Sequence, residues 1–210
     1  MNAKEQLIQY GLKMKNDCLV KANWGNLSIR VPQGFIISPS GMNYEDISIE
    51  DIVTLNLSGN IVEGFRKPSS EYLLHLEIYR EFENINAVVH THSTYASAFA
   101  VSRKEIPPII EDMVQIAGGN IRVAEYALPG TGELAKNVVK AIEGRNACLL
   151  ANHGLTGIGR NIEEAYKVCL IVEKSAQIAY ISKNLGEPFI LSDKDIEIMR
   201  EYYLNSYGQK

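Results

Sequence analysis

Residues 87–92 read AVVHTH, a short apolar run that ends in two histidines separated by a single residue. The run is rich in β-branched residues and precedes a stretch of small residues, so it predicts a buried strand that leads into a helix. Successive side chains of a strand point to opposite faces, and His90 and His92 should therefore project from the same face. Their ring nitrogens would then lie close enough to share one ion.

A third histidine, His153, ends a second apolar stretch, ACLLAN, and is followed directly by Gly154. A glycine is expected where the backbone turns sharply or must allow a close approach. Three neutral imidazoles with an open fourth position are the ligand set of a catalytic Zn²⁺ site. We therefore predict a metal site formed by His90, His92 and His153. The alternative is two strand histidines packed in the core and an unrelated loop histidine.

The segment KPSSE ends in Ser69, Ser70 and Glu71 and precedes a helical spacing of apolar residues that continues to Phe82. Either serine is expected to cap this helix. A free helix start offers unpaired N–H groups and partial positive charge, which suits an anion. The Glu71 carboxylate could ligate the metal or act as a general base, or it could simply complement the helix dipole. His75 shares its helix face with Glu71, and we expect it to be structural.

Two glycine-bearing loops near the beginning of the chain, ANWGNLS (22–28) and SPSGM (38–42), carry small residues and hydroxyls. Such loops suit the binding of a phosphate through backbone N–H groups, although each is also typical of an ordinary turn. The formal net charge is −4, with Lys and Arg scattered along the chain. An anionic ligand would therefore be held by local geometry, with the serines at 69 and 70 as a third donor segment.

The composition, 210 residues with 46% hydrophobic and 22% charged, predicts a single domain covering residues 1–210. Cys18, Cys148 and Cys169 contain no CxxC pair and leave an odd cysteine, which indicates a reducing compartment. Cys148 and Cys169 lie in apolar contexts and should be core residues. The N-terminus lacks the apolar core of a signal peptide, and no run reaches the roughly 18 apolar residues of a membrane span. We expect a cytoplasmic protein that binds neither membranes nor nucleic acids.

The order of elements predicts the fold class. Short strands come in runs with helices between them, and several connections are too short for parallel crossovers, so we predict a mostly antiparallel sheet covered by helices. The segments PQG (32–34) and SGN (58–60) predict tight turns, the second within a hairpin. The expected strands are 27–31, 35–38, 52–57, 61–63, 87–92 and 147–152, and the expected helices are 3–18, 69–82, 93–101, 134–142 and 161–183.

Six motifs follow one another along nearly the whole chain: GNLSIR (25–30), SPSGM (38–42), KPSSE (67–71), VVHTHS (88–93), PGTGELA (129–135) and NHGLTGIG (152–159). Together they resemble the class II aldolase/adducin family, and their spacing is most similar to that of its L-fuculose-1-phosphate aldolases. The combination of HTH, NHG and SSE is far more specific than any single motif. The resemblance implies a three-layer α/β/α domain with a central antiparallel sheet. It also implies a cyclic homotetramer with active sites between subunits.

The resemblance also implies roles for individual residues. The zinc ligands of the family fall on His90, His92 and His153, with one Zn²⁺ per subunit. Its acid/base carboxylate, which can also ligate the metal, falls on Glu71. The phosphate site of the family falls on Gly25, Asn26, Ser40, Gly41, Ser69 and Ser70.

Two catalytic tyrosines in the family come from a neighbouring subunit. One of them matches Tyr207, in the segment SYG near the C-terminus. The other falls in PPIIEDMVQIAGG, where this chain has Asp112. Asp112 could handle the proton on the aldehyde oxygen as an acid acting through water, or another group could take over this role. The departure from tyrosine leaves the identity of the sugar open.

The implied activity is a zinc-dependent aldolase that reversibly cleaves a ketose 1-phosphate to dihydroxyacetone phosphate and an aldehyde. L-Fuculose 1-phosphate or a related deoxy- or pentulose 1-phosphate would be the substrate. A pentulose-5-phosphate 4-epimerase, which Asp112 slightly favours, and a methylthioribulose-1-phosphate dehydratase are alternatives on the same fold. A non-catalytic, adducin-like binding module is a remote alternative, because it predicts degraded metal ligands.

Overall fold

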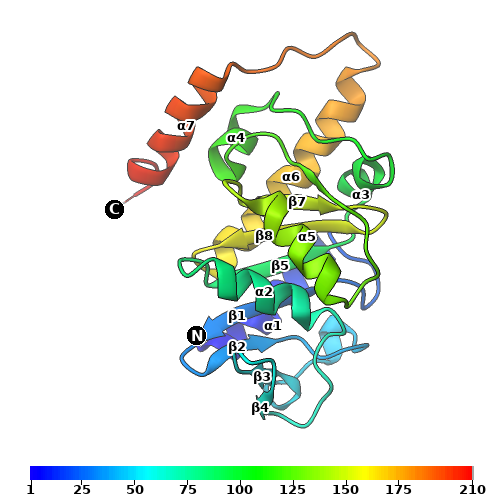
Figure 1. The fold of residues 1–210 in the computed structure, drawn as a ribbon, viewed down its shortest axis with the longest axis vertical. Helices are drawn as coiled ribbons and strands as arrows, with labels where there is room; N and C mark the ends of the chain where they lie inside the picture. Colours follow the sequence, from blue (N-terminus) through cyan, green and yellow to red (C-terminus); the bar gives the residue numbers. More distant parts are fainter. Residues whose placement is uncertain (210) are drawn as a thin grey trace.

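A computed structural model describes residues 1–209, and its centre is an eight-stranded sheet that lies between two layers of helices (Figure 1). All neighbouring strands are antiparallel except the last two, which are parallel. The mostly antiparallel sheet and the three-layer architecture are therefore confirmed. In spatial order the strands are β4 (Ile61–Glu63), β3 (Val53–Leu55), β2 (Gly34–Ile37), β1 (Asn26–Val31), β5 (Ala87–Thr91), β8 (Gly154–Gly159), β7 (Ala147–Leu150) and β6 (Val123–Ala124).

Each face of the sheet has its own apolar core. One core packs beneath α1 (Ala3–Asn16), α3 (Thr94–Val101), α4 (Glu111–Ala117) and α6 (Ile162–Ser182). The other packs beneath α2 (Tyr72–Glu81) and α5 (Gly132–Ile142), which lie in front of the sheet in Figure 1. Cys148 and Cys169 are buried, as predicted. Two short 3₁₀ turns, Tyr44–Asp46 and Ile49–Asp51, connect β2 to β3.

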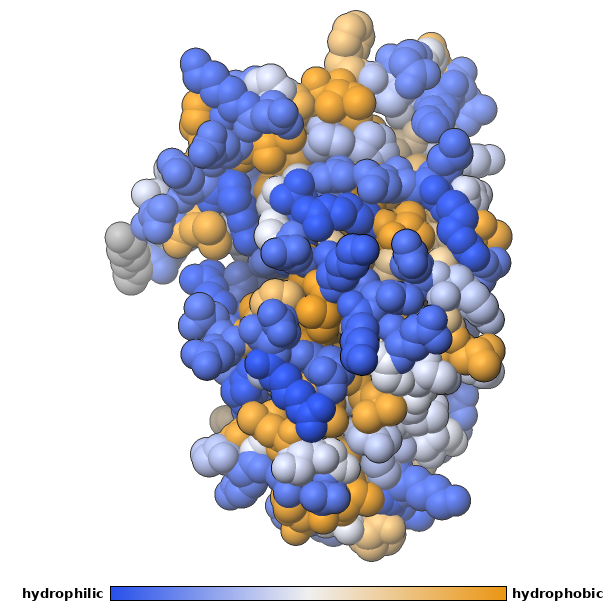
Figure 2. Space-filling model, viewed as in Figure 1, coloured by the Kyte–Doolittle hydropathy of each residue, from blue (hydrophilic) through white to orange (hydrophobic). Residues whose placement is uncertain are grey.

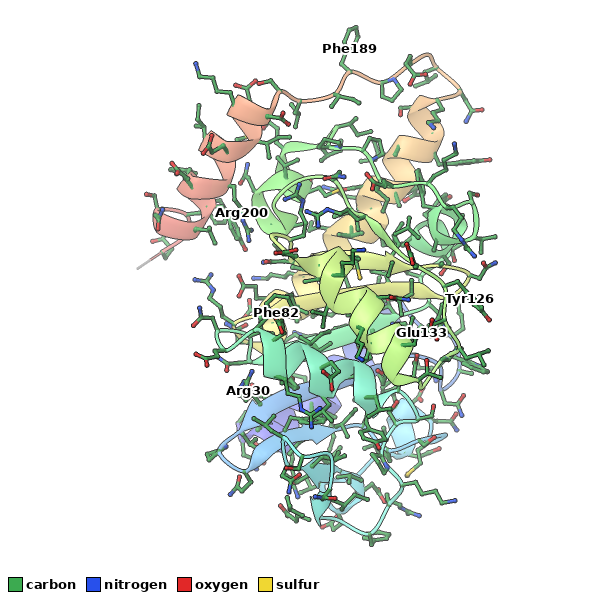
Figure 3. The ribbon with its side chains drawn as sticks, viewed as in Figure 1. Arg30, Phe82, Tyr126, Glu133, Phe189 and Arg200 are labelled. Atoms are coloured by element: carbon green, nitrogen blue, oxygen red, sulfur yellow. The ribbon has the colours of Figure 1, made fainter. Side chains whose placement is uncertain are left out.

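The C-terminal helix α7 (Asp193–Asn205) has no buried residue and lies against α4 (Figure 1). Its attachment depends on Arg200, whose guanidinium donates to the carbonyl oxygens of Gln115 at 2.6 Å and Ile116 at 2.8 Å. These carbonyls belong to the last turn of α4, where they have no partner within the helix. In Figure 3, Arg200 lies on the side of α7 that faces the rest of the molecule.

The predicted hairpin at 58–60 is present, since β3 pairs with β4 in antiparallel register, and the turn predicted at 32–34 connects the antiparallel strands β1 and β2. The predicted cap of α2 is wrong. The N-cap position is occupied by Glu71, without a side-chain cap, and the helix begins at Tyr72. The Ser69 carbonyl accepts from the Tyr72 N–H, and the Ser69 hydroxyl accepts from the Glu71 N–H at 3.3 Å. The serines therefore form a turn before the helix, and neither serine occupies its N-cap position.

Strand β8 was not predicted, because its sequence GLTGIG has little β-propensity. It nevertheless lies in the middle of the sheet, between β5 and β7. The reason is the close approach of α6: a Cβ atom at Gly157 would lie 2.6 Å from the Sγ atom of Cys169 and 3.0 Å from the Ala165 carbonyl oxygen. Glycines therefore let the longest helix pack directly against the sheet backbone. Helices α4 and α7 and the two-residue strand β6 were also not predicted.

Hydrophilic side chains cover most of the face that carries α2 and α5, and apolar residues appear there in small separate groups (Figure 2). Larger apolar side chains are exposed on the connection between α6 and α7, where Leu185 is 87% and Phe189 96% exposed. Figure 3 shows Phe189 projecting away from the body of the molecule. Among the helices of residues 1–209, none combines the length and hydropathy that crossing a membrane requires.

Candidate metal centre and active site

Four side chains from three parts of the chain converge beside the end of β5. The Nε2 atom of His90 lies 3.0 Å from that of His92 and 3.3 Å from that of His153. The Glu71 carboxylate completes the group, with Oε2 at 3.4 Å from His90 Nε2 and Oε1 at 3.4 Å from His153 Nε2. All four ligand atoms lie within 4.8 Å of one another.

These distances fit a single metal ion. A tetrahedral ion with bonds of about 2.0–2.1 Å spaces its ligand atoms about 3.3 Å apart. The Nδ1–H group of His90 donates to the Leu155 carbonyl oxygen at 3.1 Å, which leaves the lone pair of Nε2 directed at the other rings. One oxygen of Glu71 is buried without a hydrogen-bond partner. A cation at the centre would satisfy both the lone pairs and the carboxylate.

The electrostatics of the group also favour a cation. Burial, with a further contribution from the neighbouring imidazoles, lowers the pKa of His90 well below its ordinary value. Burial and the nearby His153 lower the pKa of His92 to about 4. Both rings are therefore neutral at pH 7, as metal ligands must be. The residues present fit a divalent metal ion.

The local backbone explains how ligands so far apart in sequence meet. His153 follows Asn152, which adopts a left-handed conformation with φ of 56°, a region that Asn tolerates better than most residues. Gly154 comes next and lies against β5: a Cβ atom there would be only 2.2 Å from the Thr91 carbonyl oxygen. The close approach predicted at Gly154 is present, and it brings His153 beside His90 of β5 and His92, which follows that strand.

A cavity of about 410 Å³ opens beside the metal ligands, a volume in the range of small-molecule sites. Glu71, His92 and His153 form part of its wall, and all six predicted phosphate-binding residues line it as well. Among the lining residues of the described chain, none is Lys or Arg. The full lining is Asn23, Trp24, Gly25, Asn26, Pro39, Ser40, Gly41, Ser69, Ser70, Glu71, His92, Pro129 and His153.

The two serine-containing loops are held together by backbone hydrogen bonds. Ser40 donates its N–H to the Lys67 carbonyl at 3.0 Å, and Ser69 donates to the Ser38 carbonyl at 3.1 Å. The Ser69 hydroxyl accepts from the Glu71 N–H, so its own proton is left to donate to another group. Ser40 and Ser69, which are 29 residues apart in the sequence, thus line the same cavity.

Sequence reasoning missed two features of this site. Trp24 lines the cavity, with its ring centroid 5.8 Å from that of His92. His75, expected to be structural, contacts the Asn26 side chain, which in turn donates to Glu71 Oε2 at 2.9 Å. The helical spacing of Glu71 and His75 was the available signal. It could not identify Asn26, which lies 49 residues from His75 in the sequence.

Asp112 and Tyr207 do not line the cavity of their own chain. The Asp112 carboxylate, on α4, pairs with the ammonium group of Lys174 on α6. Tyr207 follows α7, is 65% exposed, and lies 5.4 Å from the Tyr203 ring centroid. The catalytic roles predicted for both residues therefore require a second subunit.

Comparisons with known proteins agree with this geometry. The family described as "Class II Aldolase and Adducin N-terminal domain" matches residues 5–180. The chain is 43% identical over 209 residues to the 5-deoxy-D-ribulose 1-phosphate aldolase of Bacillus thuringiensis serovar kurstaki, covering 99% of this chain and 97% of that protein. It is 40% identical over 191 residues to the 5-methylthioribulose-1-phosphate/5-deoxyribulose-1-phosphate aldolase of Rhodospirillum rubrum, covering 90% and 85%. The solved structure of an L-fuculose 1-phosphate aldolase superposes with a TM-score of 0.93 at 43% identity, covering 96% of each chain.

The chain belongs to the class II aldolase and adducin family. Within that family it is an enzyme, a class II aldolase of the lyase class, since its relatives are aldolases and its three histidines and glutamate form a group that can hold a metal ion.

Proposed function

We propose that this enzyme reversibly cleaves a ketose 1-phosphate between carbons 3 and 4, giving dihydroxyacetone phosphate and a short aldehyde. The observation that carries the proposal is a single cavity that joins the metal ligands to the serine and glycine loops. One part of this cavity suits a metal-polarised carbonyl, and the other suits a phosphate held by neutral donors. The relatives named above act on sugar 1-phosphates.

His90, His92 and His153 would hold one divalent ion, for which we propose Zn²⁺ because imidazole nitrogens in tetrahedral array suit it. A bound zinc ion supplies a Lewis acid that stabilises negative charge on a substrate oxygen. Glu71 would move the proton at carbon 3. The loops of Ser40 and Ser69, with the backbone around Gly25, would hold the phosphate and so orient the reacting carbon.

The substrate we propose ends in a methyl group. Cleavage of a 5-deoxypentulose 1-phosphate between carbons 3 and 4 releases acetaldehyde, and cleavage of L-fuculose 1-phosphate releases 2-hydroxypropanal. Both aldehydes are short and end in a methyl group, which suits the apolar surfaces of Trp24 and Pro129 in the cavity wall. Asp112, which slightly favoured an epimerase in the sequence, is paired with Lys174 outside this cavity.

The test is to incubate the purified protein with 5-deoxyribulose 1-phosphate, L-fuculose 1-phosphate and a pentulose 5-phosphate. Dihydroxyacetone phosphate is detected with a coupled NADH-dependent dehydrogenase. We expect release from the first two substrates, whereas an epimerase acting on the third would release none. Glu71→Gln should lose at least about 100-fold in turnover. Near-normal turnover in that variant would remove Glu71 from the mechanism.

We also propose that the enzyme is a cyclic homotetramer with active sites between subunits. This would explain why Tyr207 and Asp112 lie outside the cavity of their own chain. It would also cover exposed apolar side chains such as Leu185 and Phe189. Light scattering coupled to size-exclusion chromatography tests the proposal, and a monomeric mass in an active preparation would contradict it.

A further inference from the structure

A chain of buried hydrogen bonds leads from the core to the Glu71 carboxylate. The Tyr79 hydroxyl lies 2.8 Å from Ser28 Oγ, which lies 2.6 Å from His75 Nδ1. On the other side of the ring, His75 Nε2 lies 2.5 Å from Asn26 Oδ1. The amide nitrogen of Asn26 then donates to Glu71 Oε2 at 2.9 Å. All five residues are buried.

The carboxylate at one end determines the direction of every bond. A carboxylate only accepts, so Asn26 must turn its NH₂ group toward Glu71 and its oxygen toward His75. His75 Nε2 must therefore carry the proton, and Nδ1 must accept from the Ser28 hydroxyl. Ser28 in turn accepts from the Tyr79 hydroxyl. Burial lowers the pKa of His75 to about 3, which is consistent with a neutral ring that has one donor and one acceptor nitrogen.

The same bonds hold a strand and a helix in register. Asn26 and Ser28 lie on one face of β1, because alternate strand residues share a face. His75 and Tyr79 are four residues apart on α2 and lie one above the other. Asn26 is also paired with His90 across β1 and β5. The hydrogen-bond chain thus connects the start of α2, where Glu71 lies, to a strand residue paired with β5, which carries His90 and ends directly before His92.

We propose that His75 is a positioning residue for the reaction. Its Nε2–H group locks the Asn26 amide in the orientation that donates to Glu71. Without the Nε2–H donor of His75, the Asn26 amide can rotate and turn its oxygen toward Glu71. The two oxygen acceptors would then repel each other, and the Glu71 carboxylate would lose its hydrogen bond. His75 therefore holds Glu71 in its working position without touching the substrate. This role rests on the proposed function of Glu71 as the group that moves the proton at carbon 3.

A pair of isosteric variants tests the proposal. The side-chain nitrogen of Gln reaches the position of Nε2, so His75→Gln keeps the donor to Asn26. Asn reaches only the position of Nδ1, so His75→Asn keeps the contact with Ser28 and loses the donor. We expect His75→Asn to lower kcat by about 10–100-fold, with KM for the ketose phosphate changed less than about threefold. His75→Gln should retain kcat within about threefold of the wild type. Equal kcat values in His75→Asn and the wild type would overturn the proposal.

A second measurement needs neither a variant nor a substrate. Nitrogen-15 NMR of the histidine-labelled wild type should show His75 as a neutral ring with its proton on Nε2, unchanged when Zn²⁺ is added. A proton on Nδ1 would overturn the proposal even if the variants do not fold. If the wild type releases no dihydroxyacetone phosphate, the proposed function fails, whereas the NMR result still decides whether the hydrogen-bond chain exists.

Discussion

Replacing Gly154 by Ala tests how the metal site is assembled, because this glycine follows the ligand His153 directly and lies against the end of β5, beside His90 and His92. The added Cβ would lie 2.2 Å from the Thr91 carbonyl oxygen, and 3.3 Å from ring atoms of both His90 and His92. A contact with backbone cannot be relieved by a side-chain rotation. Strand β8 or β5 must therefore move, and the ligands move with it.

The size of this effect follows from the distance. Real Cβ atoms essentially never approach a heavy atom closer than 3.0 Å, so the separation must grow from 2.2 Å by at least 0.8 Å. Overpacking of this kind costs about 1–3 kcal/mol in the free energy of unfolding. A displacement close to 1 Å among reacting groups costs about 100-fold in rate. We expect both losses, together with a metal Kd raised at least about tenfold.

The chain contains a natural probe for this experiment. Trp24 is the only tryptophan, and its ring centroid lies 5.8 Å from that of His92. Its fluorescence should change as Co²⁺ or Zn²⁺ is titrated into the metal-free protein, and urea unfolding followed by circular dichroism gives the stability.

Gly157→Ala is the matched control, since its Cβ would meet Cys169 Sγ at 2.6 Å on the side of α6, away from the ligands. The control should lose stability and bind metal normally. The reasoning is refuted if Gly154→Ala binds metal and releases dihydroxyacetone phosphate within about threefold of the wild type.

Three further predictions concern stability. Burial lowers the pKa of His75 to about 3 in the folded state, so as the pH falls below about 6.5 the unfolded chain binds a proton before the folded protein does. His75 therefore contributes stability that is present above about pH 6.5. This stability is lost toward pH 3 at about 1.4 kcal/mol per pH unit. Urea titrations of the metal-free protein at pH 7 and pH 5 should therefore show a smaller loss in His75→Gln than in the wild type, and equal losses would contradict this reading. The Glu173 carboxylate accepts from the N–H groups of Tyr95 and Ala96 at 2.8 Å each, so Glu173→Ala should lower the free energy of unfolding by about 1.5–3 kcal/mol. The control Glu163→Ala breaks an exposed ion pair with Lys167 and should lower it by less than about 1 kcal/mol. Similar losses in the two variants would show that Glu173 does not cap α3. Zn²⁺ at a free concentration 100 times its Kd should raise the free energy of unfolding by about 2.7 kcal/mol, and EDTA should reverse the gain. A thermal midpoint that is the same with and without Zn²⁺ would mean that the folded state does not bind the ion.

Local patterns predicted most of the regular elements and the candidate ligands. The HTH spacing on a strand requires both rings to share a face, whatever the rest of the chain does. The turns at 32–34 and 58–60 are also local: the first connects β1 to β2, and the second lies in the predicted hairpin of β3 and β4. The missed elements differ in the signal that they offer. Strand β8 is rich in glycine and lacks a clear alternation of apolar and polar residues. Helix α7 does carry apolar residues at helical spacing, Ile196, Met199 and Tyr203, although it buries none of its residues, and its pattern was overlooked.

By itself, then, the sequence identified the candidate metal ligands and the loops that we propose to hold a phosphate, because residue type and short-range spacing are enough to single out both. Only the tertiary structure decided that the serines before α2 line a cavity without capping the helix, and that His75 reaches Glu71 through Asn26. The physical reason is distance along the chain. Asn26 lies 45 residues from Glu71 and 49 from His75, and only the pairing of β1 with β5 and the packing of α2 on that face bring the three side chains into contact.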